Sequence, residues 1–314
     1  MIRVGLDVHD SILGQPHEAS RLHIQRVVES GLDFVVVGDH LSFQGGQGFD
    51  GIVSAAFALA AHPTIPVLIG VYQLALRHPL SVARQLSSIA QVAPGRLVLG
   101  VGAGGEDRKE VANAGVDPAT RGRRLDESIR LLRLLATGDP VDHEGDFFHL
   151  QHAQVLPVPS PAIPIVVGGR SPAALRRAAL LGDGWLPMFV SPRRFHDSVE
   201  RIAELATSAG RQLAIAPTLS VWCGLAPDRR HAEALLAGKL QQLYSRPYED
   251  FRNLTYAGTA ADVAEALLPY IEAGCRDFSL LAVGESWQAA VERAAEVRHR
   301  LIEVVEALPA PNRS

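Results

Sequence analysis

The stretch IPIVVGGRSPAAL, residues 163–175, joins a short apolar run to the start of a helix through a glycine turn. Its first half is rich in β-branched residues and predicts a strand, which Gly168 and Gly169 end. Ser171 is a preferred residue at a helix N-cap, and Pro172 fits the first helical position. The segment therefore predicts a strand, a turn and a helix in immediate succession.

Similar units recur along the whole chain. The apolar runs that predict strands are residues 2–8, 34–39, 65–74, 96–105, 163–169, 183–190 and 213–225, with a last one before 284. Helices are expected near 17–30, 49–62, 79–93, 118–137, 172 onward, 192–209, 258–274 and up to about 307. Strands that are apolar on both faces and alternate with helices are typical of parallel sheets. About eight such units predict an α/β fold, a TIM (β/α)8 barrel in a single domain over 1–308, with a doubly wound sheet as the alternative.

Two segments interrupt the alternation. Residues 141–162 are rich in His, Asp and Pro and predict a hairpin or an extended excursion. Residues 226–257 are polar and partly helical and predict a second insertion. Residues 309–314 are expected to form a flexible tail.

Composition excludes several classes of protein. The chain has 314 residues, 47% of them hydrophobic, and a net charge of -4, which suggests neither a nucleic acid nor an anionic membrane as partner. Cys223 and Cys275 are the only cysteines and lack metal-ligand spacing, so we expect two buried apolar residues and no metal. The N-terminal segment predicts a strand rather than a signal peptide, so a cytoplasmic protein is expected.

Polar residues follow the second apolar run, where FVVVGDHL ends in Asp39 and His40. In a TIM barrel the chemistry lies at the carboxyl ends of the strands. Imidazole titrates near neutral pH and suits proton transfer, so His40 is a candidate proton carrier. The alternative is that Asp39 only caps the following turn.

Glycines mark three further strand ends. Gly70, inside the third run, indicates a bulge or the close approach of another backbone. Gly102, Gly104 and Gly105 leave backbone exposed, where a planar ligand or an anion can rest; a plain flexible loop is the alternative. In the opening stretch, free N–H groups at the helix start, beside Arg170, predict a phosphate site. An ordinary, well-capped loop remains the other interpretation.

Taken together, four ordered blocks resemble the bacterial luciferase-like monooxygenase superfamily, and within it the coenzyme F420-dependent oxidoreductases. These blocks are GLDFVVVGDHL, LGVGAGG with NAGVDPATRGRRLDESIRLLRLL, PIVVGGRSPAALRRAALLGDGWLP and GTAADVAEALLPYIEAGCRDF. The resemblance covers nearly the whole chain. It implies a TIM barrel, often dimeric, that binds a flavin or deazaflavin at the carboxyl ends of its strands.

The resemblance also implies roles for individual residues. Asp39 matches a residue that contacts the deazaflavin, and His40 one that is catalytic in a sugar-phosphate dehydrogenase branch. A non-prolyl cis peptide behind the flavin ring matches Gly70–Val71. The remaining cofactor contacts implied are Tyr72, Gln73, Ala103, Gly104 and Gly105, and for the phosphate Gly168, Gly169, Arg170 and Ser171.

The sequence departs from the sugar-phosphate branch at two points. That branch has a Trp soon after the Asp-His pair, whereas this chain continues with residues 41–44, LSFQ, which argues against the same substrate. Its catalytic acid follows the glycines of the fourth strand, and Glu106 stands near that point in a loop one residue longer. Glu106 is therefore the second catalytic candidate, after His40.

The leading hypothesis is an F420-dependent oxidoreductase that transfers a hydride between deazaflavin C5 and a small organic substrate. A GVGAGG sequence after the fourth strand, instead of Gly-Arg-Gly, and the Asp-His pair both favour F420 over FMN. The alternatives are a two-component monooxygenase that uses reduced FMN and a non-catalytic cofactor-binding protein. A homodimer is expected, as is a separate reductase that supplies reduced cofactor if the protein acts as a reductase or monooxygenase.

Overall fold

The computed structural model describes residues 1–104 and 107–307, and strands alternate with helices along most of them. Eight strands of this part form a ring: β1 (Arg3–Asp7), β2 (Phe34–Val37), β3 (Val67–Tyr72), β4 (Leu97–Val101), β7 (Ile165–Gly168), β8 (Gly184–Leu186), β9 (Thr218–Leu225) and β11 (Asp277–Val283). Every neighbouring pair is parallel. The ring closes between β8 and β9, where the Ser220 N–H donates to the Pro187 carbonyl at 2.9 Å. The predicted TIM-barrel fold is thereby confirmed.

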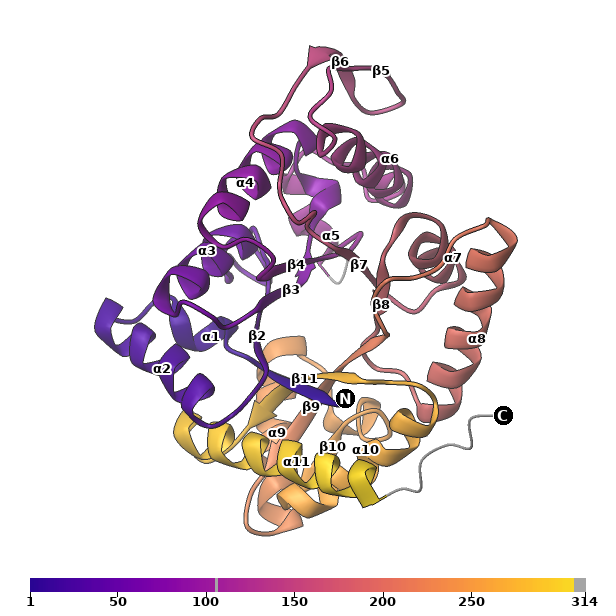
Figure 1. Cartoon of the computed structure of the whole chain (residues 1–314). Coiled ribbons are helices and arrows are strands. Elements are labelled where there is room, and N and C mark those ends of the chain that lie inside the picture. Colours follow the sequence, from indigo (N-terminus) through magenta and orange to yellow (C-terminus); the bar gives the residue numbers. More distant parts are fainter. Residues whose placement is uncertain (105–106, 308–314) are drawn as a thin grey trace.

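Helices surround this ring (Figure 1). They are α1 (His9–Ile12), α2 (His17–Glu29), α3 (Gly51–Ala61), α4 (Pro79–Val92), α5 (Arg108–Asn113), α6 (Arg121–Leu135), α7 (Pro172–Leu181), α8 (Pro192–Ser208), α9 (Arg229–Tyr244), α10 (Ala260–Glu272) and α11 (Trp287–Ala307), with 3-10 turns η1 (Leu74–Leu76) and η2 (Tyr248–Asp250). The short helices α1 and α5 were not predicted, because four and six residues carry too little periodicity to detect. Among the described residues, no helix is both long and apolar enough to cross a lipid bilayer.

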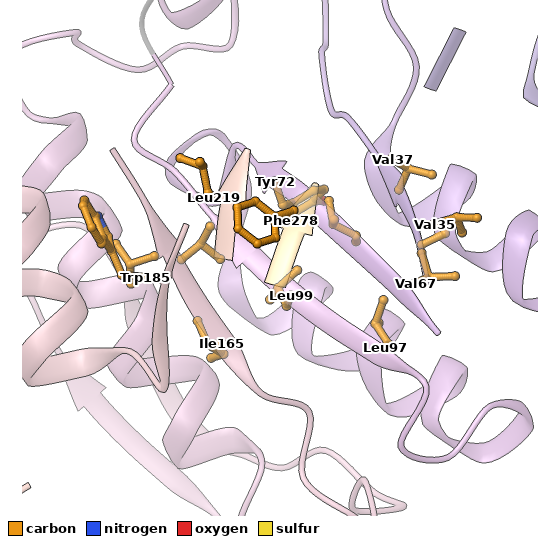
Figure 2. Close-up of a cluster of buried hydrophobic side chains, with 14 of the residues drawn as sticks. Val35, Val37, Val67, Tyr72, Leu97, Leu99, Ile165, Trp185, Leu219 and Phe278 are labelled. Atoms are coloured by element: carbon orange, nitrogen blue, oxygen red, sulfur yellow. The ribbon is translucent and has the colours of Figure 1, made fainter. Parts of the chain in front are cut away.

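Side chains alternate between two buried layers. Val35, Val67 and Leu97 lie in register on neighbouring strands and belong to a large cluster that also holds helix residues (Figure 2). Val36 and Leu68, one position further on, belong to a smaller cluster of strand and loop residues that fills the barrel interior. This two-sided burial explains why the strands are apolar at consecutive positions.

Both interrupting segments carry structure of their own. Residues 141–162 begin with an antiparallel hairpin, β5 (Val141–Glu144) and β6 (His149–Ala153), which lies beyond α6 in Figure 1. The Glu127 carboxylate of α6 accepts the Phe148 N–H at 3.0 Å and so holds the hairpin. Residues 226–257 contain α9 and the start of an unpredicted strand, β10 (Tyr256–Gly258), which pairs with β9.

Several predicted strand ends differ from the structure, and the start of β9 differs most. The run 213–225 was expected to be a strand throughout, but β9 begins only at Thr218. Pro217 precedes it and lacks the N–H that a sheet position would use. Ile215 instead donates its N–H to Asp183 at 2.9 Å and packs into the barrel interior.

Candidate functional site

Asp39 lies directly beyond β2 and is almost completely buried, with 3% of its surface exposed. Its Oδ1 accepts from the Gly51 N–H and from Arg77 Nη2, at 2.8 and 2.7 Å. Its Oδ2 accepts from the Gln73 N–H and from Arg77 Nη1, at 2.8 and 2.7 Å. Burial raises the pKa of Asp39, while the charge of Arg77 and the two N–H donors act in the opposite direction. In this structure the carboxylate therefore ties the segment after β2 to the segment after β3.

Arg77 is held on several sides. Its guanidinium forms a two-point pair with Asp39, lies 4.4 Å from the centre of the Tyr72 ring, and approaches Asp50 at 3.2 Å. Asp50 is also the N-cap of α3, where it accepts two backbone N–H groups. A planar guanidinium suits such paired recognition better than a flexible ammonium does. The positive charge of Arg77 is thus compensated by Asp39 and Asp50 of the same chain.

Glu110, in α5, is the second buried carboxylate at this end of the barrel, with 2% of its surface exposed. Its Oε1 accepts the N–H groups of Leu41 and Ser42 at 2.6 and 3.0 Å. Its Oε2 lies 3.2 Å from Gln73 Nε2 and 3.3 Å from His40 Nδ1. Burial works to raise the pKa of Glu110, but the hydrogen bonds and the nearby imidazole prevail and lower it. The sequence analysis did not identify Glu110, whose partners lie about 40 to 70 positions away.

The orientation of His40 follows from these contacts. An ionised Glu110 can only accept, so a hydrogen bond to its Oε2 requires the proton on Nδ1 of His40, a nitrogen that also lies 3.2 Å from Gln73 Nε2. The amide of Gln73 then directs its two hydrogens to the Asp39 carbonyl, at 3.0 Å, and to Glu110. Within the described part of the chain, no hydrogen bond is recorded at His40 Nε2. With the proton on Nδ1, Nε2 carries the lone pair of the ring.

Residues 41–48 form a loop beside the imidazole. Phe43 is 4% exposed, and its ring centre lies 4.3 Å from that of His40. The Gln44 N–H donates to Asp107 at 3.0 Å, and Phe43 pairs with Gln47 across the loop. Together with Glu110, these bonds fix the loop that carries His40 against the start of α5.

The expected cis peptide between Gly70 and Val71 is present. The register of β3 against β4 shifts at this point. The Val71 side chain fills space beside two glycines, since a Cβ on Gly102 or Gly168 would lie 2.6 or 2.8 Å from it. Gly168, predicted for a phosphate loop, therefore also has a packing reason to be glycine.

The segment after β4 lies next to Gln73. Gly104 has a positive φ of 68°, which favours glycine, and a Cβ there would come within 2.6 Å of Gln73 Oε1. Ala103 and Gly104 thus lie at the same rim as His40. The predicted residues Gly105 and Glu106 lie outside the described residues.

The β7–α7 loop carries the remaining predicted contacts. Ser171 is the N-cap of α7 and accepts the Ala174 N–H at 3.2 Å, as the sequence predicted. Gly169 has a φ of 103°, and its carbonyl accepts the Trp185 Nε1–H at 2.8 Å. Among the described residues, no backbone acceptor is recorded for the N–H groups of Gly169, Arg170 and Ser171. Three free donors at the start of a helix form a site suited to an anion.

The position of Arg170 adds to this site. Its guanidinium donates to the Phe189 carbonyl, and its own carbonyl accepts from Arg194 at 2.7 Å. Two guanidinium groups therefore lie near the start of α7. No group of three or more His, Cys, Asp or Glu side chains suited to a metal ion is found in the described ranges.

These features share one rim because all the barrel strands are parallel. The predicted residues after β2, β3 and β4 make direct contacts with one another through Gln73, and Val71 connects them to β7 at Gly168. An imidazole, a glycine-lined rim and the start of α7 thus lie at the carboxyl ends of the strands of a parallel barrel, the end at which enzymes of this fold carry their active sites.

Comparison with known proteins identifies the family. The sequence pattern of the luciferase-like monooxygenases matches residues 8–307, so the chain belongs to that family. An F420-dependent glucose-6-phosphate dehydrogenase of Gordonia bronchialis is 37% identical over 166 residues, which cover 50% of this chain and 49% of that protein. The chain spans about half the length of the curated relatives that it matches.

Solved structures share the fold over nearly the whole chain. An F420-dependent secondary alcohol dehydrogenase in complex with an F420-acetone adduct superposes with a TM-score of 0.84 at 22% identity, covering 96% of this chain and 99% of that one. The oxygenating constituent of 3,6-diketocamphane monooxygenase of Pseudomonas putida, in complex with FMN, superposes with a TM-score of 0.77 at 19% identity and covers 99% of both chains. At these identities the likeness establishes the fold alone.

Proposed function

We propose that this protein is an F420-dependent oxidoreductase that acts on a small organic substrate, with His40 as the proton carrier. The observation that carries the proposal is the arrangement of His40, whose Nδ1 is bonded to Glu110 and whose Nε2 has no recorded partner among the described residues. The relatives that depend on F420 support this choice of cofactor. Bound F420 supplies a deazaflavin carbon, C5, that accepts or releases a hydride.

The residues present fit such a cofactor at two points. The N–H groups of Gly169, Arg170 and Ser171 and the guanidinium of Arg170 form a donor set for a phosphate. The rim formed by Ala103 and Gly104 presents backbone with little or no side chain, which suits the approach of a flat ring system. In this proposal Gly70, Val71 and Gln73 would line the ring from the β3 side, while Tyr72 lies in the buried layer beneath Arg77 and supports them. Asp39 acts by holding Gln73 and Arg77.

His40 performs the proton transfer. In alcohol oxidation the substrate C–H bond breaks with its electron pair, which leaves as hydride. The hydroxyl proton goes to His40 Nε2, and a carbonyl product forms. In the reverse direction Nε2 returns the proton to the carbonyl oxygen. Glu110 holds the imidazole in the tautomer that both directions require, as a buried carboxylate does in other acid–base pairs.

The decisive experiment measures F420 and FMN affinity separately, and then turnover with F420 under anaerobic conditions. We expect tight F420 binding, and we expect His40→Ala to lower kcat by about 10²–10⁴-fold with F420 affinity retained. His299→Ala is the matched control, because this histidine is exposed on α11 in an ion pair with Glu303. Full turnover in His40→Ala would remove the proposed role of His40.

The opposite cofactor preference would favour a different function. Tight FMN binding, with oxygen uptake that depends on reduced FMN, would indicate a two-component monooxygenase. The family is named after monooxygenases, and one structure with the same fold is a monooxygenase constituent in complex with FMN. Cofactor binding without turnover of any substrate would indicate a non-catalytic binding protein. The proposal further includes a homodimer in the cytoplasm and, for the reductive direction, a separate enzyme that reduces the cofactor.

A further inference from the structure

A cavity of about 220 Å³ lies at the half of the barrel mouth formed by β1, β9 and β11. We call it the β1–β9–β11 pocket. Its lining includes Trp222, Leu281, Ala282, Val283 and Trp287, with Asp7 and Lys239 as the charged residues among those described. Trp222, Leu281 and Val283 also belong to one apolar cluster, packed with α9 residues. The pocket is therefore a recess with a largely apolar wall.

The strand order separates this pocket from the proposed cofactor rim. Around the sheet the strands run β9, β11, β1, β2, β3, β4 and β7. The cofactor residues proposed above follow β3, β4 and β7, whereas the pocket lies at the ends of β1, β9 and β11. His40 follows β2, which stands between the two groups. His40 is not among the residues that line the pocket, so the reacting group of a substrate held there would have to extend beyond the recess toward the end of β2.

The part of the wall formed by Trp222, Leu281 and Val283 favours an apolar body over a sugar, while Ser11, Ser286 and Lys239 also line the recess. Asp7 and Lys239 have opposite charges, and Asp7 already accepts the His9 N–H at 3.1 Å. The hydroxyl groups of a sugar would face Trp222, Leu281 and Val283 without hydrogen-bond partners, at a cost for each buried group. An apolar molecule gains free energy by covering the same surfaces.

The volume limits the size of the substrate. A protein cavity of about 150 Å³ accommodates benzene, with its six carbon atoms, so about 220 Å³ holds roughly nine non-hydrogen atoms. This range includes monocyclic and short branched molecules.

We propose that the β1–β9–β11 pocket binds the body of the substrate, and that the substrate is an uncharged apolar alcohol, or its ketone, of the size of cyclohexanol. This inference rests on the proposed function for the reaction itself, but the binding of the apolar body does not require the cofactor. Val283 is a position at which a substitution can change the free volume, because it is half-buried at the end of β11 and lines the recess.

The first test is a binding measurement on the cofactor-free protein. Cyclohexanone is expected to raise the Tm of the wild type, since a ligand that binds only the folded state stabilises it. Val283→Arg, which fills and charges the recess, should abolish this shift. Val92→Arg is the matched control, because Val92 is 78% exposed at the carboxyl end of α4, before β4 begins. No shift in the wild type, or an undiminished shift in Val283→Arg, would overturn the inference.

The second test uses turnover with F420. We expect cyclohexanol to be oxidised with a higher kcat/KM than glucose 6-phosphate. Val283→Phe reduces the volume without adding charge, so it should lower kcat/KM for cyclohexanol at least tenfold and spare propan-2-ol, with F420 affinity unchanged. A preference for glucose 6-phosphate, or equal losses for both alcohols, would contradict the inference. Failure of F420 binding would instead contradict the proposed function, and the cyclohexanone measurement would still decide the pocket.

Discussion

Removal of the Arg77 charge tests how the rim is held together. In Arg77→Met the apolar part of the side chain stays, but Asp39 loses the guanidinium that donates to both of its oxygens at 2.7 Å. The Asp39 side chain is fully buried and that of Arg77 is only 13% exposed, so solvent replaces little of this interaction. Breaking a buried pair by removing one partner costs about 3–5 kcal/mol, and we expect a loss of that size in the free energy of unfolding.

Urea denaturation of three variants measures the effect. Arg77→Met should show the full loss, whereas Asp39→Asn/Arg77→Met should lose less, because no unpaired charge is left buried. Arg300→Met is the matched control. The side chain of Arg300 is 43% exposed, and that of its partner Glu296 is 48% exposed. Such surface ion pairs contribute about 0–1 kcal/mol to the free energy of unfolding.

The pH dependence gives a second check on the same reasoning. Without Arg77, burial alone dominates and holds the pKa of Asp39 above its unfolded value of about 3.9. The folded variant then binds a proton more tightly than the unfolded chain, so its stability falls as the pH rises through the folded pKa. The deficit relative to the wild type should be largest near neutral pH and shrink on acidification. A loss below about 1 kcal/mol, or a deficit that grows towards low pH, would refute the account.

Three further predictions concern other parts of the chain. Gly100→Ala would place a Cβ 2.2 Å from the Ile69 carbonyl oxygen, so the free energy of unfolding measured with urea should fall by about 1–3 kcal/mol or more. Gly238→Ala in helix α9 is the control: a Cβ there meets no atom within 4 Å, so the free energy of unfolding should rise by about 0.5–1 kcal/mol. Glu110→Gln should lower kcat at least about tenfold with unchanged F420 affinity, and Glu110→Asp should restore part of it; equal kcat in both variants would contradict the positioning role. Burial raises the pKa of both cysteine thiols to about 12, so iodoacetamide should modify neither at mildly alkaline pH until urea unfolds the protein.

The alternation of strands and helices was largely predictable from the sequence. Apolar runs such as FVVV predict strands buried on both faces, and β2 occupies Phe34–Val37 as expected. Local rules also located the start of α7, because the N-cap of Ser171 and the position of Pro172 depend only on neighbouring residues. Short elements were missed because their structure depends on distant residues rather than on neighbouring ones. Strand β10, for example, has three residues and gains its stability from pairing with β9.

The candidate site was predictable only as a set of positions. The sequence placed Asp39 and His40 at a strand end, and the parallel fold brings them to the rim with Gly104. The sequence did not indicate that Glu110 contacts His40, which lies 70 positions away in the chain. Nor did it indicate that Arg77 forms an ion pair with Asp39, which lies 38 positions away.

By itself, the sequence determined most of the longer helices and strands, the class of barrel and the edge of the barrel where polar groups gather. These follow from periodicity, capping and the parallel arrangement of strands, all of which act over short stretches. Only the tertiary structure decided which polar groups touch, how Val71 fills the space left by Gly102 and Gly168, and where an apolar pocket opens. Contacts between loops from different strands depend on the path of the backbone in three dimensions, and no local pattern of residues encodes that path.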